Sequence, residues 1–211
     1  MDVSRETQDR LKAYEALLRK WQKAVNLVSP TTLENAWERH FVDSLQVLDC
    51  LPPCREETGK VVFCDLGSGA GFPGMVLAIA RPDIEAHLVE SDSKKCAFLQ
   101  TVSRETSTPV IVHNERIESL DSCLCRDDGS LILPDFITAR ALASLEQLLS
   151  WCLPWAEKNP AMTMVFLKGE KAPEEIAAAR KRFSFSCDGR ESKTDSGGRI
   201  LILRDLTKKE A

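Results

Sequence analysis

The chain has 211 residues, of which 43% are hydrophobic and 28% are charged, and its formal net charge at pH 7 is −4. These values are ordinary for one globular domain with an appendage, and they argue against a nucleic-acid binder that is basic over its whole surface. No apolar stretch approaches the length of a membrane span, so we expect a cytoplasmic protein with no membrane partner.

Eight cysteines are present, and Cys64, Cys96 and Cys152 lie in apolar segments typical of a protein core. Reduced thiols are therefore the expected state. The cysteine pairs at 50/54 and 123/125 lack a second CxxC or a histidine pair at the spacing of zinc sites, so we expect no metal.

Residues 1–59 are expected to form a helical appendage. Apolar side chains recur at helical spacing over residues 11–28, which predicts one amphipathic helix that Ser29-Pro30 should end. The segment Thr31-x-x-Glu34 has the pattern of a capping box and predicts the start of a second helix.

On this second helix, His40, Asp43 and Ser44 lie at positions i, i+3 and i+4 and so share one face. A histidine with a carboxylate one turn away often orients a helix on a neighbouring domain. The same groups would lie at the edge of a binding site if the appendage folded over it. The residues alone leave both interpretations open.

The chain is organised around residues 61–74, Val-Val-Phe-Cys-Asp-Leu-Gly-Ser-Gly-Ala-Gly-Phe-Pro-Gly. Residues 61–64 predict a short buried strand that ends on the carboxylate Asp65, and Pro73 stands where the first turn of a helix favours proline. The glycines between them permit positive φ angles and a close approach of a ligand to the backbone. This arrangement suits a nucleotide-like ligand.

Two ligand patterns overlap in this glycine turn. Residues 69–74 match the dinucleotide fingerprint GxGxxG, whereas residues 65–71 match the acid-first pattern DxGxGxG of Rossmann-like methyltransferases that bind S-adenosylmethionine (SAM). If the glycines bound a dinucleotide, residues 65–68 would have no role in the motif, and Pro73 would crowd the turn that must hold the pyrophosphate. The SAM register is therefore favoured, and a dinucleotide-dependent oxidoreductase is the weaker alternative.

Strands and helices are expected to alternate after this turn. Helices are predicted over residues 73–80, 94–103, 144–155 and 173–183, and further strands over residues 85–89, 109–112, 135–139 and 162–167. Residues 183–187 and 200–203 flank a polar glycine turn and predict an antiparallel pair. Residues 60–211 therefore predict an α/β, Rossmann-like class I methyltransferase domain, with a mostly parallel seven-stranded sheet and a terminal antiparallel hairpin.

Parallel strands bind ligands beyond their C-terminal ends, so the residues that follow each strand are the candidates for a site. Glu90 follows the second strand, where a carboxylate would accept hydrogen bonds from ribose hydroxyls. Ile117 and Glu118 follow the third strand and suit the plane and edge of adenine. Arg140 and Lys168 end the fourth and fifth strands, where the methyl acceptor must approach.

Five segments resemble the glucose-inhibited division protein B family, the RsmG methyltransferases of bacteria. The resemblance extends over about residues 10–204, and its segments are residues 40–45, 65–74, 91–99, 138–145 and 167–169. It implies that SAM methylates N7 of one guanine in 16S ribosomal RNA, alone or within the small-subunit particle. An enzyme with another methyl acceptor is the alternative that keeps the same fold.

The resemblance implies a set of SAM contacts, which are Gly67, Phe72, Ile117, Glu118 and Arg140. Our own interpretation of the strand ends and the turn adds Asp65, Gly69 and Glu90. The candidates for the RNA side are His40, Asp43, Ser44, Lys168 and Arg199. Guanine N7 has a free lone pair and no proton to lose, so we expect no general base. Separately, we expect the protein to be a monomer.

Overall fold

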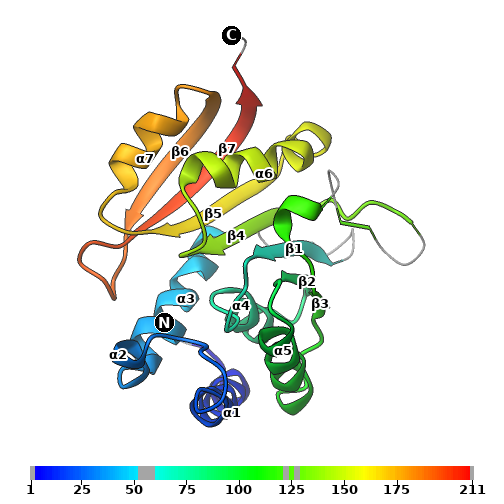
Figure 1. Ribbon diagram of the computed structural model, residues 1–211, viewed down its shortest axis with the longest axis vertical. Helices are drawn as coiled ribbons and strands as arrows, with labels where there is room; N and C mark the ends of the chain where they lie inside the picture. The colour runs from blue at the N-terminus through cyan, green and yellow to red at the C-terminus, as the bar shows by residue number, and fades with distance from the viewer. Residues whose placement is uncertain (1–2, 52–59, 121–123, 126–128, 210–211) are drawn as a thin grey trace.

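The computed structural model describes residues 3–51, 60–120, 124–125 and 129–209 (Figure 1). Its strands are β1 Val61–Leu66, β2 Ile84–Val89, β3 Ile111–His113, β4 Phe136–Arg140, β5 Thr163–Lys168, β6 Phe183–Glu191 and β7 Arg199–Lys208. Its helices are α1 Arg5–Trp21, α2 Pro30–Leu33, η1 Trp37–Val42, α3 Asp43–Leu45, η2 Gln46–Cys50, α4 Gly74–Ala80, α5 Ser93–Glu105, η3 Ile117–Ser119, α6 Leu145–Lys158 and α7 Ala172–Ala179. Within these ranges no helix is long and apolar enough to cross a membrane.

The strands form one seven-stranded sheet in the order β3-β2-β1-β4-β5-β7-β6. Five strands are parallel, whereas β7 pairs antiparallel with both β5 and β6. The strand order reverses between β1 and β4, which is where open α/β sheets bind their ligands. The predicted fold class is therefore confirmed. The third strand was predicted two residues too early, since residues 109–110 precede its pairing with β2.

The two faces of the sheet are covered by different helices (Figure 1). One hydrophobic cluster joins α1, α4 and α5 to the face that carries Phe63 and Phe136, whose rings stack 4.4 Å apart. The other cluster joins α6 and α7 to the face that carries Cys64 and Phe166. Successive residues of a strand point to opposite faces, so the near-continuous apolar runs of β1, β4 and β5 reflect burial on both sides.

Helix α1 belongs to the same hydrophobic cluster as the sheet. Its apolar stripe, Leu11, Tyr14 and Leu18, is fully buried. The Tyr14 ring stacks on Phe72, 5.4 Å between centroids, and its hydroxyl donates a hydrogen bond to the carbonyl of Ala70. Helix α1 therefore packs against the glycine turn and is hydrogen-bonded to it. The predicted boundary between the appendage and the α/β domain, at residues 59 and 60, adjoins residues 52–59, which lie outside the described part of the chain.

Helix α1 ends at Trp21, seven residues before the end that the apolar spacing predicted. The cause is the side chain of Gln22, whose Oε1 accepts from the amides of Leu27 and Val28 at 3.0 Å. Its Nε2 donates to the carbonyl of Val28 at 2.8 Å. These bonds satisfy the backbone of a loop, so the apolar side chains of residues 25–28 are buried without helical structure.

The predicted capping box at Thr31 is wrong. The N-cap of α2 is Ser29, whose Oγ accepts from the amide of Thr32 at 3.3 Å, and Pro30 takes the first helical position. The single helix expected after it is divided into α2, the π-helical turn η1, α3 and the 3₁₀ turn η2. Helix α5 begins at Ser93, and its N-cap is Asp92.

Candidate functional site

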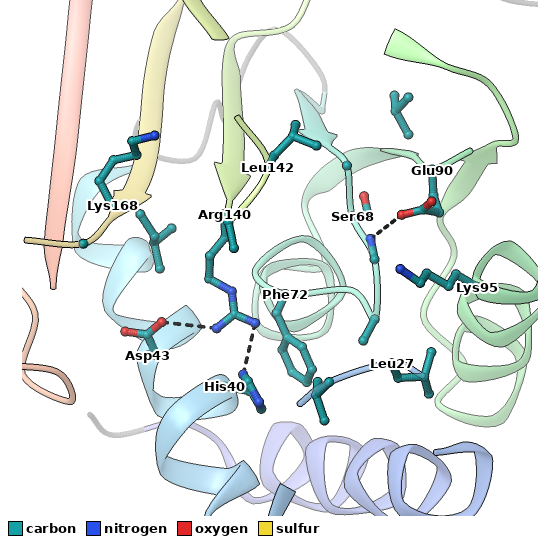
Figure 2. Close-up of a pocket in the computed structure, with 18 of the residues that line it drawn as sticks. Leu27, His40, Asp43, Ser68, Phe72, Glu90, Lys95, Arg140, Leu142 and Lys168 are labelled. Carbon is teal, nitrogen blue, oxygen red and sulfur yellow. Dashed lines mark hydrogen bonds and ion pairs between the residues drawn. The ribbon is translucent and has the colours of Figure 1, made fainter. Parts of the chain in front are cut away.

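A cavity of about 720 Å³ opens at the carboxyl ends of the parallel strands. Gly67 after β1, Glu90 after β2, Arg140 of β4 and Lys168 of β5 all line it. The appendage closes one side of this cavity, and the β6–β7 turn borders its mouth. The structure thus brings all the predicted cofactor residues except Asp65, and most of the predicted RNA residues, to one site. Figure 2 shows several of them.

The glycine turn lines the floor of the cavity. Gly67, Gly69 and Gly71 have φ angles of +64°, +58° and +92°, a region that side chains with a Cβ rarely adopt. A Cβ on Gly69 would meet only the carbonyl oxygen of Gly67, at 3.8 Å, so the backbone here faces open space. A Cβ on Gly67 would instead collide with the Leu142 side chain at 2.5 Å. The close approach of a ligand is therefore possible at Gly69.

Glu90 holds this turn in place. Its Oε2 accepts from the amide of Gly69 at 2.8 Å, and its Oε1 accepts from the amide of Asp92 at 2.8 Å (Figure 2). The residue is only 8% exposed and lines the cavity. Each carboxylate oxygen can accept more than one hydrogen bond, so Glu90 retains capacity for ligand hydroxyls.

Asp65 differs from the prediction, because it does not line the cavity. Its Oδ1 accepts from the hydroxyl of Thr138 at 2.5 Å. Its Oδ2 is buried beneath the first turn of α4 and has no hydrogen-bond partner among the residues that the structure describes. Burial raises the pKa of Asp65 to about 6, although the hydrogen bond from Thr138 opposes the shift. The carboxylate therefore lies behind the turn that it was expected to serve.

Short helix η3 forms the wall beside Glu90. Ile117 and Glu118 both line the cavity, Ile117 half-buried and Glu118 exposed. Sequence reasoning missed Leu142 and Trp151 in the same lining. Leu142 lies within the segment 138–145, which could have identified it, whereas Trp151 looks like any core residue of α6.

Arg140 is a largely buried cation of the site. Its NH1 lies 3.3 Å from Asp43 Oδ2, and the two side chains are only 17% and 15% exposed. Its NH2 lies 3.1 Å from His40 Nδ1, and its guanidinium carbon lies 5.2 Å from the centroid of the Phe72 ring (Figure 2). The His40 ring also stacks on the Phe72 ring, with the two ring centroids 4.9 Å apart. NH1 of Arg140 also donates to the carbonyl of Arg39 at 3.3 Å. One charge pair, two neutral acceptors and one aromatic face thus hold the guanidinium.

His40 is neutral in this cluster. Burial lowers its pKa to about 4, and the nearby charge of Arg140 acts in the same direction. Because Nδ1 accepts from Arg140, the ring proton lies on Nε2, which donates to Thr32 Oγ1 at 3.0 Å. Both ring nitrogens are occupied, so His40 orients Arg140 and is not placed to remove a proton.

The other predicted RNA residues have different surroundings. Ser44 is fully buried and donates to the carbonyl of His40 at 2.6 Å, so it does not reach the cavity. The ammonium of Lys168 is occupied by Glu175 Oε2 at 2.6 Å and by the carbonyl of Ala143 at 2.7 Å. Lys168 was a candidate for the RNA side, and its charge is paired within the protein. Arg199 lines the mouth and is 42% exposed.

The described residues contain no group of three or more His, Cys, Asp or Glu side chains that could hold a metal ion. Two of the cysteines named above for metal binding, at positions 54 and 123, lie outside the described residues. Residues 65–72 and 90 instead provide positive-φ backbone, open space and a carboxylate, which fit a nucleoside cofactor.

Sequence comparison matches residues 7–200 to the family described as GidB, rRNA small subunit methyltransferase G. The chain is 44% identical over 210 residues to the ribosomal RNA small subunit methyltransferase G of Paramagnetospirillum magneticum (strain ATCC 700264 / AMB-1), with 99% of this chain and 94% of the relative covered. It is 45% identical over 206 residues to the protein of the same name from Rhodospirillum centenum (strain ATCC 51521 / SW), with 97% and 87% covered.

Among solved structures, an O-methyltransferase from Bacillus cereus in complex with SAH superposes with a TM-score of 0.58 at 16% identity, over 92% of this chain and 90% of the other. The fibrillarin/Nop5p complex gives a TM-score of 0.57 at 14% identity, over 80% of this chain and 82% of the other. At such low identity these likenesses establish the fold alone.

The buried carboxylate of Asp65 predicts a pH dependence of stability. Its pKa in the folded protein, about 6, exceeds the ordinary value of 3.8, so the folded state binds this proton more tightly. The resulting stabilisation is complete below pH 3.8 and is lost as the pH rises through 6. Asp65→Asn removes this dependence. The stability of the variant relative to the parent should therefore increase by about 2 kcal/mol between about pH 4.5 and about pH 7.5.

Urea unfolding at the two pH values measures this difference, and the other titrating groups cancel because both proteins carry them. A stability difference that does not change with pH would show that the folded Asp65 carboxyl has an ordinary pKa.

Proposed function

Because the chain belongs to the rRNA small subunit methyltransferase G family, we propose that it transfers the methyl group of SAM to N7 of one guanine in 16S ribosomal RNA. SAM-dependent methylation of small-subunit ribosomal RNA is the activity of this family. The observation that carries the proposal is the family match over residues 7–200, together with one cavity at the switch point of the sheet. The oxidoreductase alternative has no support from any of these comparisons.

SAM supplies an electrophilic methyl group on its sulfonium when it is bound. In this proposal the Gly69 backbone and the Glu90 carboxylate hold the cofactor, with Glu90 accepting from the ribose. The wall formed by Ile117 and Glu118 takes the adenine. Arg140 and Phe72 lie on the side of the cavity that faces the appendage, where the methionine end would be placed. Gly67 contributes the turn itself, and Asp65 supports it from behind.

The chemistry requires little more of the protein than positioning. Guanine N7 attacks through a lone pair and has no proton to remove, so no general base is needed. The neutral, fully engaged imidazole of His40 agrees with such a reaction, because its position beside Arg140 gives orientation and no free basic nitrogen. Exclusion of water and correct orientation of the two reactants then account for the rate enhancement.

The RNA is proposed to approach past the appendage and the β6–β7 turn, near Arg199. Arg39, which sequence reasoning missed, also lines this mouth. Lys168 and Asp43 line the same half of the cavity, although their charges are partly engaged within the protein.

We further propose a monomeric, cytoplasmic enzyme that consists of the appendage 1–59 and the catalytic domain 60–211. Its substrate is 16S ribosomal RNA or the small-subunit particle.

The proposal is tested by mapping N7-methylguanine in 16S ribosomal RNA with and without the protein. Unmodified RNA and unmodified small subunits are each incubated with SAM and the enzyme, and the RNA is then cleaved chemically at N7-methylguanine. We expect one new cleavage site that requires both SAM and the enzyme. Methylation at a different atom or in a different RNA, with none at a guanine N7, would contradict the proposal.

Arg199 predicts a measurable contribution to RNA binding. Its ion pair with Glu191 joins side chains that are 42% and 81% exposed, so the guanidinium can exchange partners at little cost. Arg199→Ala should weaken RNA association and reduce the slope of log affinity against log salt by about one unit, because one phosphate contact is lost.

Arg204→Ala is the matched control for this experiment. Arg204 lies on the same strand, is 45% exposed and pairs with Asp188, which is 78% exposed, but it does not line the cavity. Both variants remove one positive charge from β7. Equal losses of RNA affinity and equal salt slopes in the two variants would show that the RNA does not contact Arg199.

A further inference from the structure

We infer that Asp43 is a positioning residue through which the β6–β7 turn holds Arg140 in the cofactor cavity. The inference rests on the proposed function, in which Arg140 contacts SAM. Its basis is that the two carboxylate oxygens of Asp43 have different hydrogen-bond partners. Oδ2 faces Arg140, whereas Oδ1 faces a turn that lies about 150 residues away along the chain.

The turn supplies two hydroxyl groups to Oδ1 of Asp43. Thr194 Oγ1 donates to this oxygen at 2.8 Å, and Ser192 Oγ lies 3.2 Å from it. These contacts fix the plane of the carboxylate, since an oxygen bound to two hydroxyls on a structured turn cannot rotate freely. Oδ2 is thereby kept within 3.3 Å of the Arg140 guanidinium.

The appendage binds the same turn through two further side chains. Gln46 Oε1 accepts from the amide of Lys193 at 2.7 Å. Arg39 donates to the carbonyl of Thr194 at 3.2 Å and to Asp195 Oδ2 at 3.1 Å. The position of the turn relative to Asp43 is therefore defined by backbone contacts as well as by the two hydroxyls.

Arg140 needs such external support because burial disfavours its charge. Burial lowers the pKa of Arg140, and the charge of Asp43 is the first influence that opposes this shift. His40 contributes an acceptor but no charge. Asp43 therefore supplies the opposite charge for Arg140, and together with His40 and the carbonyl of Arg39 it directs the guanidinium.

This arrangement has a consequence for binding. Ser192, Asp195 and Arg199 of the turn line the cavity mouth at which the RNA is proposed to enter. A ligand that displaces the turn would also alter the partners of Asp43 and hence the position of Arg140. By thermodynamic linkage, RNA at the turn and SAM beside Arg140 would then change each other's affinity by the same factor.

The test compares SAM affinity in a double-mutant cycle, measured by calorimetry on the full chain without RNA. The first arm is Ser192→Ala/Thr194→Val, which removes both hydroxyls from Asp43 and leaves every charge in place. We expect its SAM dissociation constant to rise by about three- to tenfold, which corresponds to the loss of ordinary hydrogen bonds. The second arm is Arg140→Lys, and the third combines all three substitutions.

The control is Ser186→Ala/Thr207→Val on the same hairpin. Ser186 donates to Asp205 Oδ2 at 2.9 Å, both hydroxyl residues are exposed, and neither lines the cavity. The composition change is thus identical, and this variant should bind SAM as the parent does. If Ser192→Ala/Thr194→Val is too unstable to study, Thr194→Val alone removes the shorter of the two bonds and should show a smaller rise.

The inference predicts that the turn substitutions have little further effect once Arg140 is replaced. Equal effects in the parent and the Arg140→Lys backgrounds, or no effect in the parent, would overturn the proposed role of Asp43. Unchanged SAM affinity in Arg140→Lys and in Arg140→Ala would instead overturn the assignment of Arg140 to the cofactor, on which the inference depends. A purely structural role of the turn would lower the melting temperature without this dependence on Arg140.

Discussion

The structure depends on the largely buried ion pair between Arg140 and Asp43 in the cavity wall. A guanidinium removed from water is costly unless an opposite charge and oriented acceptors replace its hydration. Asp43 provides the charge, His40 an acceptor and Phe72 the aromatic face. The last residue of β4 is therefore bound by the appendage and by the glycine turn at once.

The part of the appendage that faces Arg140 consists of short helical turns. Turns η1 and α3 direct His40 and Asp43 toward Arg140, whereas Phe41 lies in the core. On the same face, Tyr14 binds the carbonyl of Ala70 and packs on Phe72. The appendage is thus part of the cavity wall and shares its hydrophobic core with the sheet.

Sequence reasoning predicted the features that local chemistry determines. The strand and glycine turn around Asp65 follow from apolar runs and glycine spacing, and Glu90 follows from its place after a strand. Features that depend on particular side-chain hydrogen bonds were not predictable. The end of α1 is set by the side chain of Gln22, and the role of Asp43 is set by a turn about 150 residues later. The ion pair of Lys168 was also not predictable, because nothing in its own segment reveals Glu175.

The central claim is that the Asp43–Arg140 pair holds the appendage, the sheet and the β6–β7 turn together. A double-mutant cycle in the free energy of unfolding, with Asp43→Asn, Arg140→Met and the double variant, tests it most directly without any ligand. Each single variant leaves one largely buried charge without its opposite charge, so we expect a loss of more than about 2 kcal/mol from each. We expect the loss in the double variant to be about 1–3 kcal/mol smaller than the sum. Losses that add to within about 0.5 kcal/mol would contradict the account.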